Sequence, residues 1–148
     1  MSDIVRPRSN PANNNVSNVK SMKRMFWNCG KFNSDLSQWD VHCVQNMSEM
    51  FYGCYNLTSV DLSEFETDDV INMGSMFMGC NSLIKIDVTQ FDTSNVTNMN
   101  SMFEGCESLT TLDLRNFDFT NVDDSSYMFY QCTSLKNAYA KTTEDADF

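Results

Sequence analysis

A motif of five residues recurs along this chain at an almost constant spacing. Its clearest copies read M-F-x-G-C at 50–54, 76–80 and 102–106, and weaker copies stand at 25–29 and 128–132. The phenylalanines of the five copies are separated by 25, 26, 26 and 26 residues. Self-similarity at such a period is typical of a solenoid, in which each repeat forms one coil stacked on the last. The period therefore constrains the architecture far more than it constrains the ligand.

The complete repeat follows the pattern V-x-x-M-x-x-M-F-x-G-C-x-x-L-x-x-L-x-L-x-x-F, which is cleanest from Val96 to Phe117. At 112–114 apolar and polar residues alternate, which predicts a short strand with Asp113 facing outward. We expect equivalent strands at 35–36, 60–62 and 86–88. Strands at the same place in successive coils would pair in parallel, ~4.8 Å apart.

The M-F-x-G-C segment itself predicts a short helical turn. Small or polar residues precede it where an N-cap is wanted, and a glycine follows where the chain must leave the helix. The N-cap positions are Ser48, Gly74, Asn100 and Ser126, and the exit glycines are Gly53, Gly79 and Gly105. In the last copy Ala138 and Ala140 replace the strand leucines, which predicts a C-terminal edge.

Composition divides the chain into a polar tail at 1–15, the repeats at 16–140 and an acidic tail at 141–148. The formal net charge is −10; residues 1–31 carry +5 and residues 32–148 carry −15. An acidic body repels nucleic acid and anionic membranes, so we expect neither as a partner. No apolar run is long enough to insert into a membrane, and the N-terminus has no apolar signal-peptide region.

Three runs, at 32–41, 56–63 and 92–103, resemble the BspA-type leucine-rich repeat, and the resemblance extends over about residues 16–140. It implies an α/β leucine-rich-repeat solenoid of about five right-handed coils, with short parallel strands and short helical turns. It also implies a binding role: surface adhesion in bacteria and parasitic protists, or less defined roles in large DNA viruses.

Cysteine recurs once per repeat, and a further Cys43 stands beside the single histidine, His42. The recurring set is Cys29, Cys54, Cys80, Cys106 and Cys132. Without close C-x-x-C pairs, we interpret the set as buried thiols that pack like apolar residues, not as a metal site or a disulfide framework. Free thiols favour a reducing compartment. His42 and Cys43 fall on a surface connection, where we expect no catalysis, and we expect no cofactor.

Aspartates recur at the predicted strands, and these are our candidate partner-binding residues. They are Asp35, Asp61, Asp87 and Asp113. A second acidic column follows the strands. It consists of Asp40, Glu66, Asp92 and Asp118. Stacked like charges repel, so backbone N–H groups, a cation such as calcium or a basic partner must offset them. The spacing contains no recognised calcium loop.

Two further columns predict structural roles. Asn46, Asn72 and Asn98, with Asp124 in the last copy, are expected to form a ladder of stacked amides. The aromatic column that ends each strand is expected to lie in the core at a corner. It consists of Trp39, Phe65, Phe91 and Phe117.

The sequence therefore predicts a non-enzymatic interaction or scaffold protein. The alternatives are a structural component of a larger assembly such as a virion, and an adhesin-like module on a cell surface. A basic first coil and an acidic last coil also predict self-association. Its candidate residues are Lys20, Lys23, Arg24, Asp123 and Asp124. Free thiols favour an intracellular or assembled protein, whereas the family resemblance favours a surface, so the location stays open.

Overall fold

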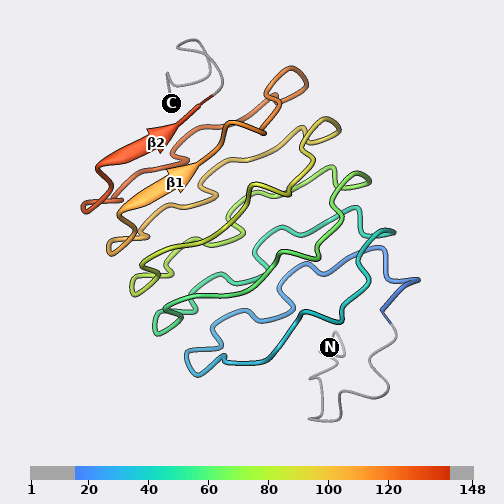
Figure 1. Ribbon diagram of the computed structural model, residues 1–148, viewed down its shortest axis with the longest axis horizontal. Helices are drawn as coiled ribbons and strands as arrows, with labels where there is room; N and C mark the ends of the chain where they lie inside the picture. Colours follow the sequence, from blue (N-terminus) through green and yellow to red (C-terminus); the bar gives the residue numbers. More distant parts are fainter. Residues whose placement is uncertain (1–15, 141–148) are drawn as a thin grey trace.

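Successive copies of the repeat lie on top of one another as coils, with the first copy and the last copy at opposite ends of the stack (Figure 1). The computed structural model describes residues 16–140; both predicted tails lie outside them. Isolated parallel bridges join the same position of neighbouring coils. They pair Ser21 with Asn46, Asn46 with Asn72, Asn72 with Asn98, and Asn98 with Asp124. Each coil thus contacts mainly the coil before it and the coil after it.

Only two strands form in the described part of the chain, and they lie at its C-terminal end. β1 (Thr111–Asp113) pairs in parallel with β2 (Asn137–Tyr139), and Asp113 stands opposite Tyr139. The predicted strand at 112–114 is thus displaced by one residue. The strands expected at 35–36, 60–62 and 86–88 do not form, and the supposedly degraded last copy contributes β2.

The predicted α/β leucine-rich-repeat solenoid with helical turns is wrong, because residues 16–140 contain no helix. No helix forms because the residues two positions before and two positions after each phenylalanine of the motif have positive φ. Around Phe77 these residues are Ser75 (φ 54°) and Gly79 (φ 74°). A left-handed residue interrupts a right-handed helix, so the segment forms a series of turns instead. The glycines predicted to end a helix do adopt the left-handed conformation, but they lie in a series of turns and not at the end of a helix.

The phenylalanines of the motif form a continuous stack through the core. The centroid distances along Phe26, Phe51, Phe77, Phe103 and Phe129 are 5.3, 5.4, 5.5 and 5.9 Å. The three central rings are fully buried and lie almost parallel, with interplanar angles of 4° and 5°. The second aromatic column is also buried, as predicted. Its members are Trp39, Phe65, Phe91 and Phe117.

The cysteine column is structural. All six cysteines are free, and Cys54, Cys80 and Cys106 are fully buried, which confirms the predicted thiol ladder in the middle of the stack. The prediction is wrong for Cys29, which is exposed on the first coil, and Cys132 on the last coil is half-buried. Each of the three buried thiols also donates to the carbonyl of a phenylalanine in the preceding coil, for example Cys80 Sγ to Phe51 O at 3.2 Å. Burial raises the pKa of Cys54 to about 12, so that thiol is protonated at neutral pH.

Candidate functional site

The aspartates predicted to bind a partner each begin a tight turn. In each, Oδ1 accepts the backbone N–H of the residue two positions later, at 2.9–3.1 Å. The pairs are Asp35–Ser37, Asp61–Ser63, Asp87–Thr89 and Asp113–Arg115. A short polar side chain that bonds the backbone two residues on is the usual device of an Asx turn. The repeat thus fixes one carboxylate per coil at the same place.

These turns keep the carboxylates charged. The N–H of Ser63, followed by its hydroxyl, lowers the pKa of Asp61, although the charges of Asp35 and Asp87 oppose that shift. The hydroxyl and N–H of Thr89 likewise lower the pKa of Asp87. Backbone N–H groups are therefore what offsets the repulsion within the column, one of the three possibilities that the sequence left open. We call Asp35, Asp61, Asp87 and Asp113 the aspartate row.

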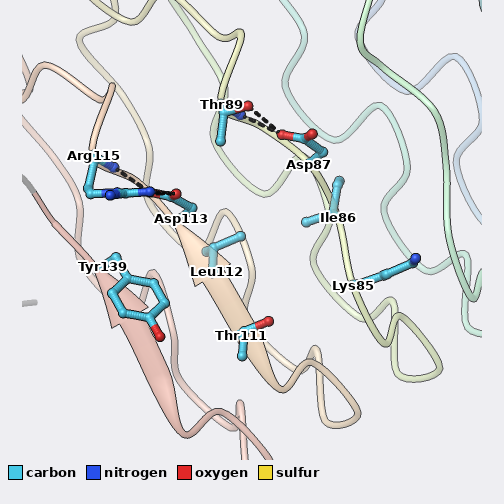
Figure 2. Close-up of a pocket in the computed structure, with 9 residues that line it drawn as sticks. All are labelled: Lys85, Ile86, Asp87, Thr89, Thr111, Leu112, Asp113, Arg115 and Tyr139. Carbon is cyan, nitrogen blue, oxygen red and sulfur yellow. Dashed lines mark hydrogen bonds and ion pairs between the residues drawn. The ribbon is translucent and has the colours of Figure 1, made fainter.

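An open groove of about 530 Å³ lies along the C-terminal half of this row, between the third coil and β2. Figure 2 shows Asp87 and Asp113 on adjacent coils, with the Tyr139 ring on β2 at its far side. Tyr139 occupies the position of an aspartate in the earlier copies, and its side chain is half exposed. The groove therefore combines carboxylates with one accessible aromatic ring.

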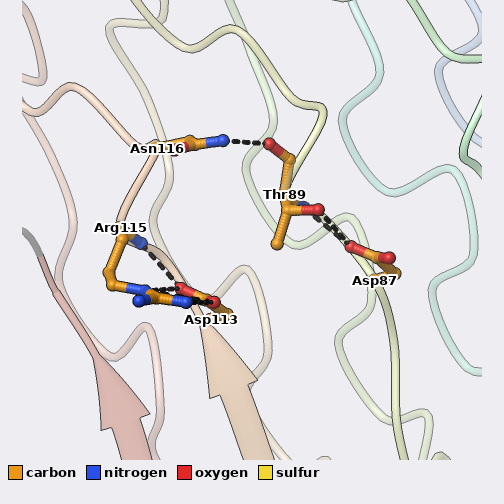
Figure 3. A network of polar contacts seen from close by, with 5 residues as sticks. All are labelled: Asp87, Thr89, Asp113, Arg115 and Asn116. Atoms are coloured by element: carbon orange, nitrogen blue, oxygen red, sulfur yellow. Dashed lines mark hydrogen bonds and ion pairs between the residues drawn. The ribbon is translucent and has the colours of Figure 1, made fainter.

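Arg115 changes the charge at one end of the row, and the sequence analysis did not identify it. Its Nε lies 2.9 Å from Asp113 Oδ1 and its Nη2 lies 2.6 Å from Oδ2. Figure 3 shows this pair beside the Asp87–Thr89 turn, with the Asn116 amide donating to the Thr89 carbonyl. Asp113 is thus neutralised within the chain. The position of Arg115 in the sequence could have revealed this pair, because the residue two places after each aspartate of the row bonds to that carboxylate.

The predicted self-association residues lie at opposite ends of the stack. Lys20 is exposed on the first coil, whereas Asp123 and Asp124 are exposed on the last. Lys23 and Arg24 already pair with Glu49 of the second coil, at 3.5 and 2.6 Å. These two basic residues therefore have partners that the sequence analysis did not foresee.

The remaining polar columns form turns as well. Asn46, Asn72 and Asn98 each accept, at Oδ1, the N–H two residues on, at 2.9 Å. The coils are joined at these positions through the backbone carbonyls, for example by Met73 N donating to Asn98 O at 2.9 Å, so this bond of each side chain lies within its own coil. His42 is exposed and its ring contacts Asp40, a pairing that raises the pKa of His42.

Acid is expected to destabilise the stack. The folded state lowers the pKa of the row's carboxyls below the ordinary value of 3.8, so the folded chain binds fewer protons than the unfolded chain. The stabilisation is present above pH 3.8 and is lost as the pH falls through the lower folded-state values. We expect a lower melting temperature by circular dichroism at about pH 3 than at about pH 5. An unchanged or higher value at the lower pH would contradict these turns.

Comparison with known proteins places the chain in a family. Residues 7–86 and 57–145 match the family described as "Mycoplasma protein of unknown function, DUF285". The chain belongs to the DUF285 family. No curated protein and no solved structure matches this DUF285 chain. Within residues 16–140 there is neither a helix able to cross a membrane nor a group of three potential metal-ligating His, Cys, Asp or Glu side chains.

Proposed function

We propose that this chain is a non-enzymatic binding protein whose aspartate row docks a basic segment of a protein partner. The observation that carries the proposal is the repetition of one fixed, ionised carboxylate per coil. Asp35, Asp61 and Asp87 are exposed, and each uses only Oδ1 in its turn bond to the backbone. Their second oxygens remain available to Lys or Arg side chains, whose guanidinium or ammonium groups suit carboxylates.

The groove gives the bound segment a direction. A second hollow, which Asp61 and Asp87 both line, continues the row toward the second coil. An extended chain following the row would pass Asp61 and Asp87 and reach Tyr139, whose ring can stack on a guanidinium group. Arg115 forms an ion pair with Asp113, so the negative charge available to a partner decreases toward β2. A basic residue of the partner would thus be favoured near the first three coils and an apolar or planar group near β2.

Catalysis by the cysteine thiols is a weaker candidate function. The buried thiols of Cys54, Cys80 and Cys106 donate to backbone carbonyls, and burial raises the pKa of Cys54 to about 12, so these thiols are poor nucleophiles at neutral pH. The resemblance to BspA-type repeats supports a binding role, either in adhesion or in an assembly.

The test is the affinity for a labelled oligo-arginine peptide, measured by fluorescence anisotropy on the full chain. The double variant Asp61→Asn, Asp87→Asn keeps the oxygen that accepts each turn N–H but removes two charges. We expect it to weaken binding about tenfold, and we expect added salt to weaken wild-type binding.

The matched control is Asp92→Asn with Asp118→Asn. These aspartates form the same turns, with Ser94 and Thr120, but belong to the second acidic column. We expect this control to bind almost as tightly as the wild type. Equal loss in both double variants would show that only net charge matters and would overturn the proposed site, as would the absence of binding by the wild type.

A further inference from the structure

Around the phenylalanines the coils are joined by a backbone hydrogen-bond ladder with one direction, whereas other bonds between coils, such as Thr97 N to Ile71 O, run the opposite way. Around each phenylalanine, four alternate N–H groups donate to carbonyls of the next coil, at 2.7–3.2 Å. In the third coil the donors are Met73, Ser75, Phe77 and Gly79, and their acceptors are Asn98, Asn100, Met102 and Glu104. Every N–H of this ladder therefore points toward the C-terminal end of the stack, and every accepting carbonyl points back.

A ladder with one direction leaves different groups at its two ends. On the last coil the N–H groups of Ser125, Tyr127 and Gln131 occupy donor positions but have no acceptor within residues 16–140. On the first coil the equivalent open groups are carbonyls, and no residue of that same range donates to them. They belong to Ser21, Lys23, Met25 and Trp27. Unpaired backbone groups at the edge of a sheet-like array are a template for another chain.

The two ends also match in charge and in side chains. Lys20 and Asp123 occupy the same repeat position, because successive backbone bonds connect Lys20 through the intervening coils to Asp123. Trp27 and Tyr130 likewise share one position, and within the stack Trp27 already lies on Tyr52 at 6.2 Å. Trp27 is 47% exposed and Tyr130 is 54% exposed. Each of these side chains would face its counterpart if one stack continued into the next.

We infer that a second copy of this chain docks on the end of the stack, so that the last coil of one copy donates to the first coil of the next. The contact repeats the register between the fourth and fifth coils, and it pairs Asp123 with Lys20. Such a head-to-tail contact does not close by itself and can extend into a filament. The inference uses the ends of the stack and is independent of the aspartate row.

Charge reversal tests the contact on the full chain, by sedimentation velocity at low and high salt. The wild type is expected to form elongated oligomers that dissociate as salt is added. Lys20→Asp and Asp123→Lys should each weaken association about tenfold, because like charges then meet. Both positions are exposed, so the fold should persist, as circular dichroism will show.

Mixing the two variants makes the test specific. The altered first coil of Lys20→Asp complements the altered last coil of Asp123→Lys, and the unaltered Asp123 and Lys20 of the two variants also meet. The mixture should therefore restore elongated oligomers in which the two variants alternate, and the double variant should form them by itself. Lys85→Asp and Asp69→Lys make the same charge changes on exposed positions of middle coils and should associate like the wild type. A wild type that is monomeric at the highest concentration reached would overturn the inference, as would a mixture that fails to restore association.

Discussion

Replacing Phe77 by alanine is expected to lower the free energy of unfolding by about 3–5 kcal/mol. The ring is fully buried at the centre of the stack, with its centroid 5.4 Å from that of Phe51 and 5.5 Å from that of Phe103. The variant leaves a cavity between two coils and removes two stacked contacts. Because each coil is held mainly by its neighbours, a defect in the middle weakens both halves of the stack.

Urea unfolding followed by circular dichroism measures this loss. Phe129→Ala is the comparison at the end of the column, where the ring is only half-buried and its centroid lies 5.9 Å from that of Phe103. We expect it to cost clearly less than Phe77→Ala. If the two variants lost the same free energy, the stacked column would not be the main support of the coils.

Gly79→Ala is expected to destabilise the chain by about 1–2 kcal/mol, because an L-residue is strained in the left-handed region. The φ of Gly79 is +74°, and an added Cβ would lie 3.6 Å from the Cα of Gly53, an ordinary contact. The cost therefore comes from the backbone conformation and not from a clash.

At Ser75, the other residue of this coil with positive φ, we expect a substitution to change the free energy of unfolding in the opposite direction. Ser75 has φ 54° and carries this strain already, so Ser75→Gly should raise the free energy of unfolding by up to about 1 kcal/mol. Thermal and urea unfolding of both variants measure the difference. A stabilising Gly79→Ala together with a destabilising Ser75→Gly would mean that this segment is helical after all.

The repeat period and the buried columns could be predicted because they depend on the side chains that recur. The phenylalanines, the central cysteines and the corner aromatics lie where the pattern put them. The backbone between them could not be predicted in the same way. M-F-x-G-C has the spacing of a helical turn, but Ser75 and Glu49 adopt positive φ that their residue types do not signal.

The strands were also predicted correctly in some coils and wrongly in others. Leu112 and Asp113 lie in β1, whereas the equivalent residues at 60–62 and 86–88 do not form a ladder. Next to the predicted strands the bonds between those coils are isolated, as between Ile84 N and Thr58 O at 3.2 Å, whereas Leu114 N lies 2.7 Å from Tyr139 O beside β1. Alternation reports which residues face inward, but hydrogen bonding depends on how closely neighbouring coils approach.

The candidate site was predicted as a column of carboxylates but not as a set of turns. Stacked aspartates could be found from the period alone. The partners two residues on, above all Arg115, required the turn geometry, because one carboxylate was then seen to be neutralised and the other three to remain open.

The most direct test of the account is the amide NMR spectrum of the full chain during titration with the oligo-arginine peptide. The aspartate row predicts shifts at the N–H groups that its carboxylates hold, above all Ser37, Ser63 and Thr89. Shifts concentrated instead at Ser94 and Thr120, in the turns of the second acidic column, would contradict the proposed binding surface.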